Sequence, residues 1–243
     1  MDWRGRFQTR EKSPTDLVTD ADVASQEAIR LEIARHFPSH AFVGEEEPAG
    51  LPAEDEYVWI VDPLDGTTNY VHGYPAYAVS VALARGRELL AGVIYDPIQD
   101  CCFSAELGQG AWCDGVRMEV TRARAVSESL VAVSLPPRVE RDSLDLVDFA
   151  EASQACRAVR RSGSAALNLA YVARGWLDAF WATQILPWDV AAGVLMIQEA
   201  GGCVTGRDGG KFDLWNPHFL AAATPQLHEG LLRLLAPFDD GAV

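Results

Sequence analysis

The sequence predicts an α/β protein whose first half is α+β and whose second half is α/β. Two observations support this prediction: strand-like runs follow one another between about 57 and 107, and helical and strand patterns alternate from about residue 129 onward. The chain has 243 residues, 49% of them hydrophobic, which is enough for a large core. We therefore expect two regions, 1–128 and 129–243, that together form one compact unit.

The first region begins with a polar stretch, 1–14, that we interpret as a mobile arm or an edge extension. Residues 19–22 then have the spacing of a capping box, and apolar residues recur every four positions as far as Phe37. This pattern predicts a helix that ends at Pro38. An acidic loop at 44–48 follows the helix.

Four apolar runs rich in β-branched and aromatic residues come next, separated by turn residues. The strands that they predict are 57–61, 77–84, 89–96 and 101–107, with a Gly/Thr/Asn loop after the first. Successive strands joined by short turns indicate an antiparallel meander.

In the second region, helices alternate with strands. The predicted elements are a strand from 131, helix 144–156, strand 158–161, helix 164–174, strand 177–181, helix 188–200, strands 202–205 and 218–223, and helix 225–236. Pro187 suits the first turn of the helix at 188–200, and Gly201-Gly202 suits its C-terminal cap.

The charge of the chain excludes some classes of partner. With 35 acidic and 20 basic residues, the net charge is −15, and there is no basic stripe to neutralise a phosphate backbone. We expect no binding to nucleic acid or to membranes. The sequence has no apolar run of membrane-spanning length and no signal-peptide core after its first residues, which predicts a cytoplasmic protein. The five cysteines lack C-x-x-C spacing and are expected to be reduced thiols packed in the core.

The most informative segment is 62–69, DPLDGTTN, which directly follows a predicted buried strand. Its two aspartates, Asp62 and Asp65, flank a proline turn, and carboxylates this close repel each other unless a cation lies between them. Oxygen ligands without nearby His or Cys favour Mg²⁺ or Mn²⁺ over zinc. The small residues that follow can bring backbone N–H groups close to a phosphate. The alternative is that the segment is only an Asx-rich turn.

Three other carboxylates are individually ambiguous. Glu45 lies in the acidic loop, where it could be one more solvated charge, and Asp22 has the spacing of a helix-capping residue. Asp189 falls in the first turn of a predicted helix, where an acid also stabilises the helix dipole. Together with Asp62 and Asp65 they supply five carboxylates, enough for two or three divalent cations.

At this point the sequence resembles the inositol monophosphatase family. Residues 59–70 (WIVDPLDGTTNY) and 188–193 (WDVAAG), continuing to 199–202 (EAGG), resemble two signature motifs of that family, and 16–22 and 44–46 match it in order and spacing. The resemblance extends from about residue 12 to the C-terminus. It implies a layered αβαβα sandwich, a homodimer, inhibition by lithium, and Mg²⁺-dependent hydrolysis of a small phosphorylated alcohol by two or three ions per site.

Carried over position by position, the resemblance also implies a role for particular residues. The implied metal ligands are Glu45, Asp62, the backbone carbonyl of Leu64, Asp65 and Asp189. The implied catalytic residues are Asp22, Thr67 and Glu45, with Thr67 and Asp22 orienting and deprotonating the attacking water. The implied substrate-binding residues are Asp65, Gly66, Thr67, Thr68, Gly163, Ser164, Ala165 and Asp189.

The sequence departs from the family pattern at two places. The family usually has a helix of some 25–30 residues before the segment that starts near Lys12, and this chain has only residues 1–11 there, which we interpret as a genuine short form. Seven residues before Asp189, where inositol-phosphate enzymes typically carry a glutamate, this chain has Ala182. We expect that Ala182, at this position in the wall of the substrate site, makes the enzyme less selective for the alcohol part of its substrate.

The expected activity is hydrolysis of an inositol-1-phosphate-type monoester. The alternatives within the superfamily are phosphatases acting on fructose 1,6-bisphosphate, histidinol phosphate or a 3′-phosphonucleotide. An alternative of another class is a non-catalytic protein that binds a metal or a partner on the same fold.

Overall fold

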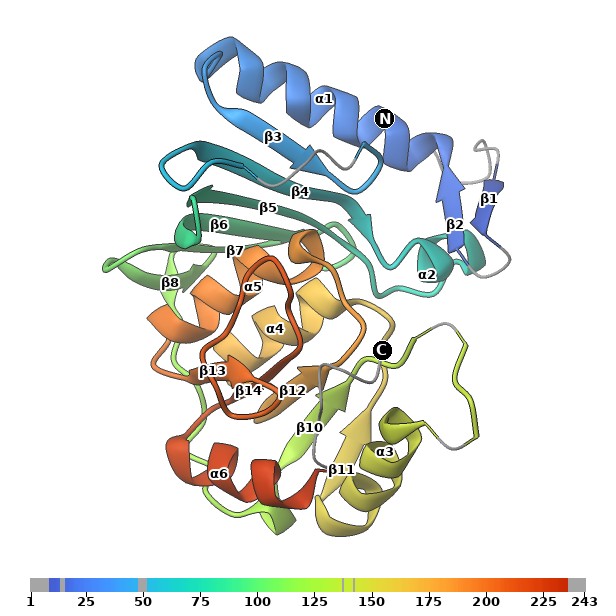
Figure 1. Ribbon diagram of the computed structural model, residues 1–243, viewed down its shortest axis with the longest axis vertical. Coiled ribbons are helices and arrows are strands. Elements are labelled where there is room, and N and C mark those ends of the chain that lie inside the picture. Colours follow the sequence, from blue (N-terminus) through green and yellow to red (C-terminus); the bar gives the residue numbers. More distant parts are fainter. Residues whose placement is uncertain (1–8, 14–15, 48–51, 137, 142, 236–243) are drawn as a thin grey trace.

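The computed structural model describes residues 9–13, 16–47, 52–136, 138–141 and 143–235. Five layers of secondary structure follow one another along its long axis (Figure 1). They are a helix, a seven-stranded sheet, a pair of helices, a five-stranded sheet and a second pair of helices. The predicted α/β class and layered sandwich are therefore confirmed.

The first described residues form a hairpin. β1 (Thr9–Ser13) pairs antiparallel with β2 (Asp16–Thr19) in a separate two-stranded sheet. Residues 9–13, predicted to be a mobile arm or an edge extension, are therefore neither, and residues 1–8 and 14–15 lie outside the described residues. α1 (Asp20–His36) follows directly. Both bonds of the predicted capping box at Thr19 are present, and α1 ends at its C-cap residue Phe37, just before Pro38.

The seven-stranded sheet has the order β3-β4-β5-β6-β7-β8-β9. Its strands are β3 (Ala41–Gly44), β4 (Tyr57–Asp65), β5 (Ala78–Arg85), β6 (Glu88–Asp96), β7 (Cys101–Glu106), β8 (Gly110–Cys113) and β9 (Val116–Arg117). From β4 onward all neighbours are antiparallel, which confirms the meander, whereas β3 pairs parallel with β4 and was not predicted. The predicted loop after β4 is wrong, because a short helix, α2 (Thr67–His72), begins there.

The five-stranded sheet has the order β11-β10-β12-β14-β13. Its strands are β10 (Leu130–Val133), β11 (Ala158–Arg160), β12 (Ala179–Ala182), β13 (Cys203–Gly206) and β14 (Phe219–Ala222). The helices of this half are α3 (Leu144–Ala155), α4 (Ala165–Ala173), α5 (Pro187–Glu199) and α6 (Pro225–Leu234), preceded by a 3₁₀ turn, η1 (Val126–Glu128). All the helices and strands predicted for 129–243 are present.

The ends of α5 show why the local patterns were informative. Pro187 occupies the first turn, where its missing N–H costs no hydrogen bond. At the other end Gly201 has φ 90°, and the N–H groups of Gly201 and Gly202 donate to Gln198 and Ile197. These two bonds stop the helix at Glu199.

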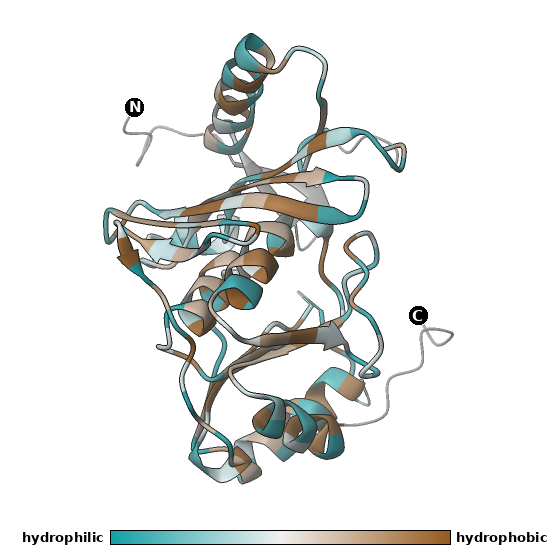
Figure 2. Cartoon of the chain, turned by 90° about the vertical axis from the view of Figure 1, so that its left-hand side faces the viewer, coloured by the Kyte–Doolittle hydropathy of each residue, from teal (hydrophilic) through white to brown (hydrophobic). Residues whose placement is uncertain are grey.

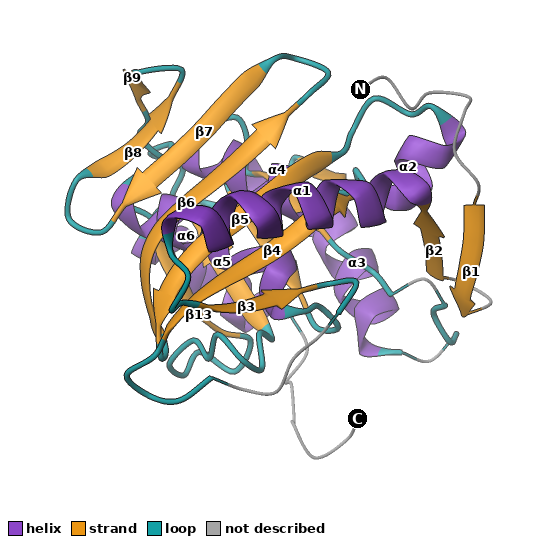
Figure 3. Ribbon diagram, turned by 90° about the horizontal axis from the view of Figure 1, so that it is seen from above, coloured by secondary structure: helices purple, strands orange, loops and turns teal. Residues whose placement is uncertain are grey.

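The middle layer, α4 and α5, packs between the two sheets, and the buried hydrophobic residues of both helices belong to the larger hydrophobic core cluster. Glycines allow the closest approaches: a Cβ on Gly92 of β6 would lie 2.8 Å from the backbone of Ala192 in α5, and one on Gly193 would lie 2.3 Å from Leu169 in α4. Figure 2 shows the apolar residues of these layers. Seen from above, α1 crosses the outer face of the seven-stranded sheet (Figure 3). None of the helices in the described residues has the length and apolarity needed to span a bilayer.

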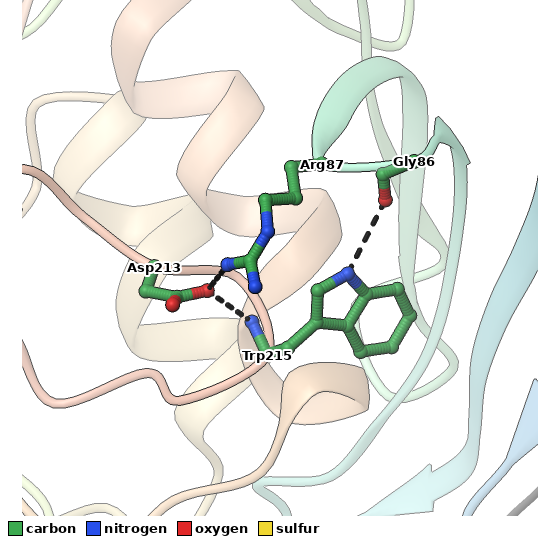
Figure 4. A network of polar contacts seen from close by, with 4 residues as sticks. All are labelled: Gly86, Arg87, Asp213 and Trp215. Atoms are coloured by element: carbon green, nitrogen blue, oxygen red, sulfur yellow. Dashed lines mark hydrogen bonds and ion pairs between the residues drawn. The ribbon is translucent and has the colours of Figure 1, made fainter. Parts of the chain in front are cut away.

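A polar contact also joins the seven-stranded sheet to the segment before β14 (Figure 4). Arg87, in the β5–β6 turn, forms an ion pair with Asp213, and the indole N–H of Trp215 donates to the carbonyl of Gly86 at 3.2 Å. Burial alone would raise the pKa of Asp213, but the hydrogen bond from Arg87 and the N–H of Trp215 hold it below its usual value. The contact therefore favours an ionised Asp213 beside the sheet.

Candidate active site

Two aspartates lie at the end of β4, on either side of a bulge. Asp62 pairs with Ser80 and Asp65 pairs with Ala78, so that β4 has one more residue than β5 between the two pairs. Side chains three residues apart in a regular strand point to opposite faces. The bulge contains Pro63, which has no N–H to give to the sheet, and it lets both carboxylates reach one cluster.

Asp65 is held at the N-terminus of α4, in the other half of the molecule. Its carboxylate accepts hydrogen bonds from the Ser164 hydroxyl and from the backbone N–H groups of Ala165 (3.1 Å) and Ala166 (2.9 Å). Ser164 is also the N-cap of α4, accepting from the N–H of Leu167. A carboxylate from residue 65 therefore supplies acceptors for a helix about 100 residues further along the chain.

Asp189 comes from the first turn of α5. One of its carboxylate oxygens accepts from the backbone N–H of Leu186, the N-cap residue, at 2.9 Å. The hydroxyl of Ser80 in β5 donates to the carbonyl of Trp188 at 3.3 Å, which ties this helix end to the seven-stranded sheet.

The three aspartates together form a compact group of oxygen ligands. One carboxylate oxygen of each of Asp62, Asp65 and Asp189 lies within 4.8 Å of the others, and the first two side chains are buried. Burial raises the pKa of Asp62 well above its usual range, and the neighbouring carboxylates, Glu45 first, raise it further. Such mutual repulsion is relieved by shared protons or by a cation.

The other two aspartates titrate differently from each other. Burial raises the pKa of Asp65 to about 6, although the donors of α4, Ser164 first, act in the opposite direction. Burial also raises the pKa of Asp189 to about 8, the charge of Asp65 adds to this, and the single N–H of Leu186 opposes it. The difference has two causes: Asp65 accepts more hydrogen bonds than Asp189, and the charges of Asp65 and Glu45 raise the pKa of Asp189 further.

Glu45 lies next to this cluster, directly after β3. Its N–H donates to the carbonyl of Val61 in β4 at 3.2 Å, and its charge raises the pKa of both Asp62 and Asp189. The parallel pairing of β3 with β4 explains the proximity, since it aligns the ends of the two strands. Glu45 therefore belongs to the carboxylate cluster and is not only one of a run of solvated charges.

Asp22 and Thr67 are in contact, 45 residues apart in the sequence. The Thr67 hydroxyl lies 3.0 Å from one carboxylate oxygen of Asp22 and 3.1 Å from the carbonyl of Leu64. The other oxygen of Asp22 accepts from the N–H and hydroxyl of Thr19. Asp22 is completely buried. The same side chain therefore serves both the helix cap at Thr19 and the contact with Thr67.

A cavity of about 770 Å³ opens beside the aspartates, in the size range of small-molecule sites. Its wall includes the predicted substrate-binding residues Asp65, Thr68, Gly163, Ser164, Ala165 and Asp189. Gly66 and Thr67 lie in the adjoining turn, where Gly66 has φ 92° at the N-cap of α2. A Cβ at Gly66 would lie 2.9 Å from the carbonyl of Ala76, so a larger residue does not fit.

Asn69 has a role beyond the turn that the sequence predicts. Its side-chain N–H₂ donates to the carbonyls of Ala76 (2.6 Å) and Ser162 (2.8 Å), tying α2 to the turn at Gly163. The bond to Ser162 joins the two halves of the molecule at the cavity wall. The motif places Asn69 near the site, but no local pattern indicates a partner 93 residues away.

The expectation for Ala182 is corrected by the structure. Ala182 is completely buried in β12, opposite Phe219, and is not part of the cavity wall. Gln184 and Ile185, which follow Ala182 closely in the sequence, do line the cavity, and so does Arg161. These three residues were not singled out from the sequence, because nothing in their local pattern marks a cavity.

The donor set fits a hard divalent cation. All the ligand atoms are oxygens of closely spaced carboxylates. Burial and mutual repulsion raise the pKa of Asp62 and Asp189, so the ionised cluster is unfavourable without a positive charge. Mg²⁺ binding through deprotonated carboxylates would release protons and relieve the repulsion.

Comparison with known proteins gives consistent matches along the chain. The model of the inositol monophosphatase family matches residues 2–237. An inositol-1-monophosphatase of Mesorhizobium japonicum is 39% identical over 229 residues, covering 93% of this chain and 85% of that protein. The chloroplastic phosphatase IMPL1 of Arabidopsis thaliana is 40% identical over 235 residues, 93% of this chain; the chain spans only 62% of that relative's length.

Solved structures agree with these matches. The extragenic suppressor protein SuhB of Bartonella henselae has a TM-score of 0.88 and 37% identity, covering 94% of this chain and 88% of that chain. An IMPase/NADP phosphatase complexed with Mg²⁺ and phosphate has a TM-score of 0.85 and 26% identity, covering 94% of this chain and 86% of that chain.

Proposed function

Because the chain belongs to the inositol monophosphatase family, a family of phosphatases, we propose that it hydrolyses the phosphate monoester of a small polyol or sugar with the help of Mg²⁺. The observation that carries this proposal is the group of three carboxylates within 4.8 Å, two of which, Asp65 and Asp189, line a cavity. Family membership supports a phosphatase, and the chemistry of the donor set supports the cation.

The proposed ligands for two or three Mg²⁺ ions are Glu45, Asp62, the carbonyl of Leu64, Asp65 and Asp189. When bound, such ions activate a water and stabilise the developing negative charge of a phosphate ester. The protein's part is to hold these oxygens in place, through the bulge in β4 and the first turns of α4 and α5.

Asp22 and Thr67 are proposed to handle the proton of the attacking water, with Glu45 as a third catalytic residue. Thr67 directs its hydroxyl proton toward Asp22 and Leu64, which leaves an oxygen lone pair to accept a hydrogen bond from water. Asp22 is fixed by its bonds to Thr19, so the pair is oriented before substrate binds.

The phosphate is proposed to bind at the N–H groups of Gly66, Thr67 and Thr68. The first N–H groups of a helix have no carbonyl acceptor within the helix, and the left-handed conformation of Gly66 starts this turn. The alcohol part of the substrate would lie in the cavity, against Asp65, Asp189 and the turn of Gly163, Ser164 and Ala165.

The identity of the alcohol is a finer proposal. An inositol-1-phosphate-type substrate is supported by the names of the relatives at about 40% identity. Fructose 1,6-bisphosphate, histidinol phosphate and a 3′-phosphonucleotide are the alternatives, and a solved relative is described as an NADP phosphatase. Because Ala182 is buried, we propose that Gln184 and Arg161, on the cavity wall, influence the choice of alcohol.

The test is phosphate release from a panel of polyol, sugar and nucleotide phosphates, with Mg²⁺ and with EDTA. We expect Mg²⁺-dependent release that Asp62→Asn abolishes. The matched control is Asp55→Asn, an aspartate whose side chain is 92% exposed, and it should retain activity. Failure of the wild type to release phosphate from every compound, while folded and binding Mg²⁺, would support the non-catalytic alternative.

The homodimer that the resemblance implies remains a prediction. Sedimentation equilibrium of the full chain would check it, with a single species of about 26.4 kDa contradicting it.

A further inference from the structure

A second group of ligand atoms lies on β7 and β8, away from the carboxylate cluster. Sulfur atoms of Cys101 and Cys113 and a carboxylate oxygen of Asp114 all lie within 4.8 Å of one another. The two sulfurs are 2.9 Å apart. The prediction of cysteines packed in the core is confirmed for Cys101, Cys113 and Cys156, which are buried, and is wrong for Cys102, which is exposed; Cys203 is intermediate. That the thiols are reduced stays a prediction.

The sheet register explains how residues 12 positions apart meet. Phe103 is opposite Cys113 in the β7–β8 pair, so Cys101 lies diagonally across from Cys113 on the same, buried face. The chain then turns at Asp114 and Gly115, which both have positive φ (48° and 77°). This two-residue turn brings the Asp114 carboxylate back beside the thiols.

The carboxylate of Asp114 is held beside the two thiols. The N–H of Cys102 donates to one of its oxygens at 2.9 Å, and the sulfur of Cys113 lies 3.9 Å from the other. In the described residues, none of the ion pairs includes Asp114. Its carboxylate can therefore bind a cation without breaking an ion pair.

We propose that Cys101, Cys113 and Asp114 form a binding site for a thiophilic divalent cation such as Zn²⁺. Two thiolates and one carboxylate are three ligands of a tetrahedral site, with the fourth position open to solvent. The two thiol protons leave to solvent as the two metal–sulfur bonds form, and no electrons are transferred. Cys101 and Cys113 retain 9% and 8% of their surface, and Asp114 is exposed, so an ion can enter from that side.

The competing interpretation is a redox pair that forms a disulfide. The sulfur separation of 2.9 Å lies between a disulfide bond of about 2.05 Å and the roughly 3.8 Å between two thiolates on one tetrahedral zinc, so either requires a small side-chain movement. The carboxylate decides between them. It supplies a third ligand for a metal ion, whereas a disulfide joins the two sulfur atoms and has no use for a carboxylate.

The proposed site is distinct from the carboxylate cluster in place and in chemistry. β7 is three strands from β4 in the sheet, which corresponds to about 14 Å at the usual strand spacing. Mg²⁺ prefers the all-oxygen cluster, whereas sulfur ligands select softer ions such as Zn²⁺ and Co²⁺. Excess Mg²⁺ can therefore occupy the carboxylate cluster while binding of a softer ion at the two cysteines is measured.

The experiment is a titration of the reduced, full-length protein with Co²⁺ in excess Mg²⁺, followed by competition with Zn²⁺. We expect an absorption band from thiolate-to-cobalt charge transfer that saturates at one ion per chain and disappears when Zn²⁺ is added. Cys101→Ser and Cys113→Ser should each remove most of the band. Cys102→Ser, the exposed neighbour, and Cys203→Ser, in the other sheet, are the matched controls and should retain it.

Asp114→Asn provides a variant that should fold normally, since asparagine also tolerates positive φ. We expect it to weaken Co²⁺ binding by roughly tenfold or more, the effect typical of altered groups around a metal. The proposal is overturned if the reduced wild type gives no band, or if the band survives both cysteine substitutions. A redox pair would give a different result. Two titratable thiols would be lost in air, a peptide cross-linked between Cys101 and Cys113 would be found, and the reduced protein would show no cobalt band.

Discussion

The N-termini of α4 and α5 each hold an aspartate of the same cluster, and they do so in different ways. The N-terminus of α4 receives Asp65 from a distant strand and gives it three hydrogen bonds, whereas the N-terminus of α5 supplies its own Asp189 and gives it one. Their pKa values, about 6 and about 8, follow that difference. Asp65 and Asp189 have the same side chain, but Asp189 depends more strongly than Asp65 on a nearby cation to be ionised near neutral pH.

This contrast separates two functions of a buried carboxylate. Asp65 both caps a helix and joins the two halves, so removing it also leaves buried donors without an acceptor. Asp189 contributes mainly negative charge to the cluster, so the folded chain without a metal gains little from it. The following experiments test whether this division is real.

The largest expected effect does not distinguish the two aspartates. Asp65→Ala and Asp189→Asn should each lower kcat/KM for the best substrate by roughly a thousandfold, the several kcal/mol expected of a metal centre. Steady-state phosphate release at saturating Mg²⁺ measures this. Activity within tenfold of wild type in either variant would remove that residue from the proposed site.

Stability should distinguish them. We expect Asp65→Ala to lower the free energy of unfolding in EDTA by about 2–3 kcal/mol, because Ser164 and two backbone N–H groups lose their acceptor. Asp189→Asn should not lower it. Urea denaturation measures both, with the exposed Asp55→Ala as the control that should change by less than about 0.5 kcal/mol. Equal losses for the two variants would contradict the division of roles.

The pH dependence should sharpen the comparison further. A raised pKa in the folded state stabilises the fold below the unfolded value near 4, and this contribution is lost as the pH rises through about 6 for Asp65 and about 8 for Asp189. In EDTA, the stability of Asp189→Asn relative to wild type should therefore increase by about 1 kcal/mol or more between pH 6 and pH 9. Mg²⁺ should stabilise the wild type more at pH 8 than at pH 5.5, as measured by urea denaturation. A difference that does not vary with pH would contradict the raised pKa of Asp189.

The smallest effect concerns the hydrogen bond between Asn69 and Ser162, which joins the two halves of the molecule. Asn69→Ala removes the donors to Ala76 and Ser162, so the turn that presents Ser164 to Asp65 should become less well fixed. We expect KM to rise by about three- to tenfold with a smaller change in kcat, since a tether acts mainly on binding. Asn216→Ala, outside the cavity wall, is the matched control. An unchanged KM would show that the halves are fixed without this bond.

Much of the fold followed from local patterns. The capping box at Thr19, the proline and glycines around α5 and the apolar runs of the meander each act within a few residues, so they can be recognised without the rest of the chain. β3, β8, β9 and α2 were not predicted, because turn residues lie beside each of them and hide the local pattern: β3 ends at Gly44, α2 lies between Gly66 and Gly73, and β8 and β9 flank the turn at 114–115.

Local sequence patterns were enough to predict the secondary structure of the second half, the family resemblance and the identity of the clustered carboxylates. The fold was needed for the bulge at Pro63 and the helix end that holds Asp65, which make those carboxylates differ. It was also needed for the burial of Ala182 and for the contact between Cys101 and Cys113. Each of these depends on residues far apart in the chain or on opposite strands. Burial and hydrogen-bond partners, which set pKa values and cavity walls, are properties of the packed molecule, whereas capping and periodicity are properties of short segments.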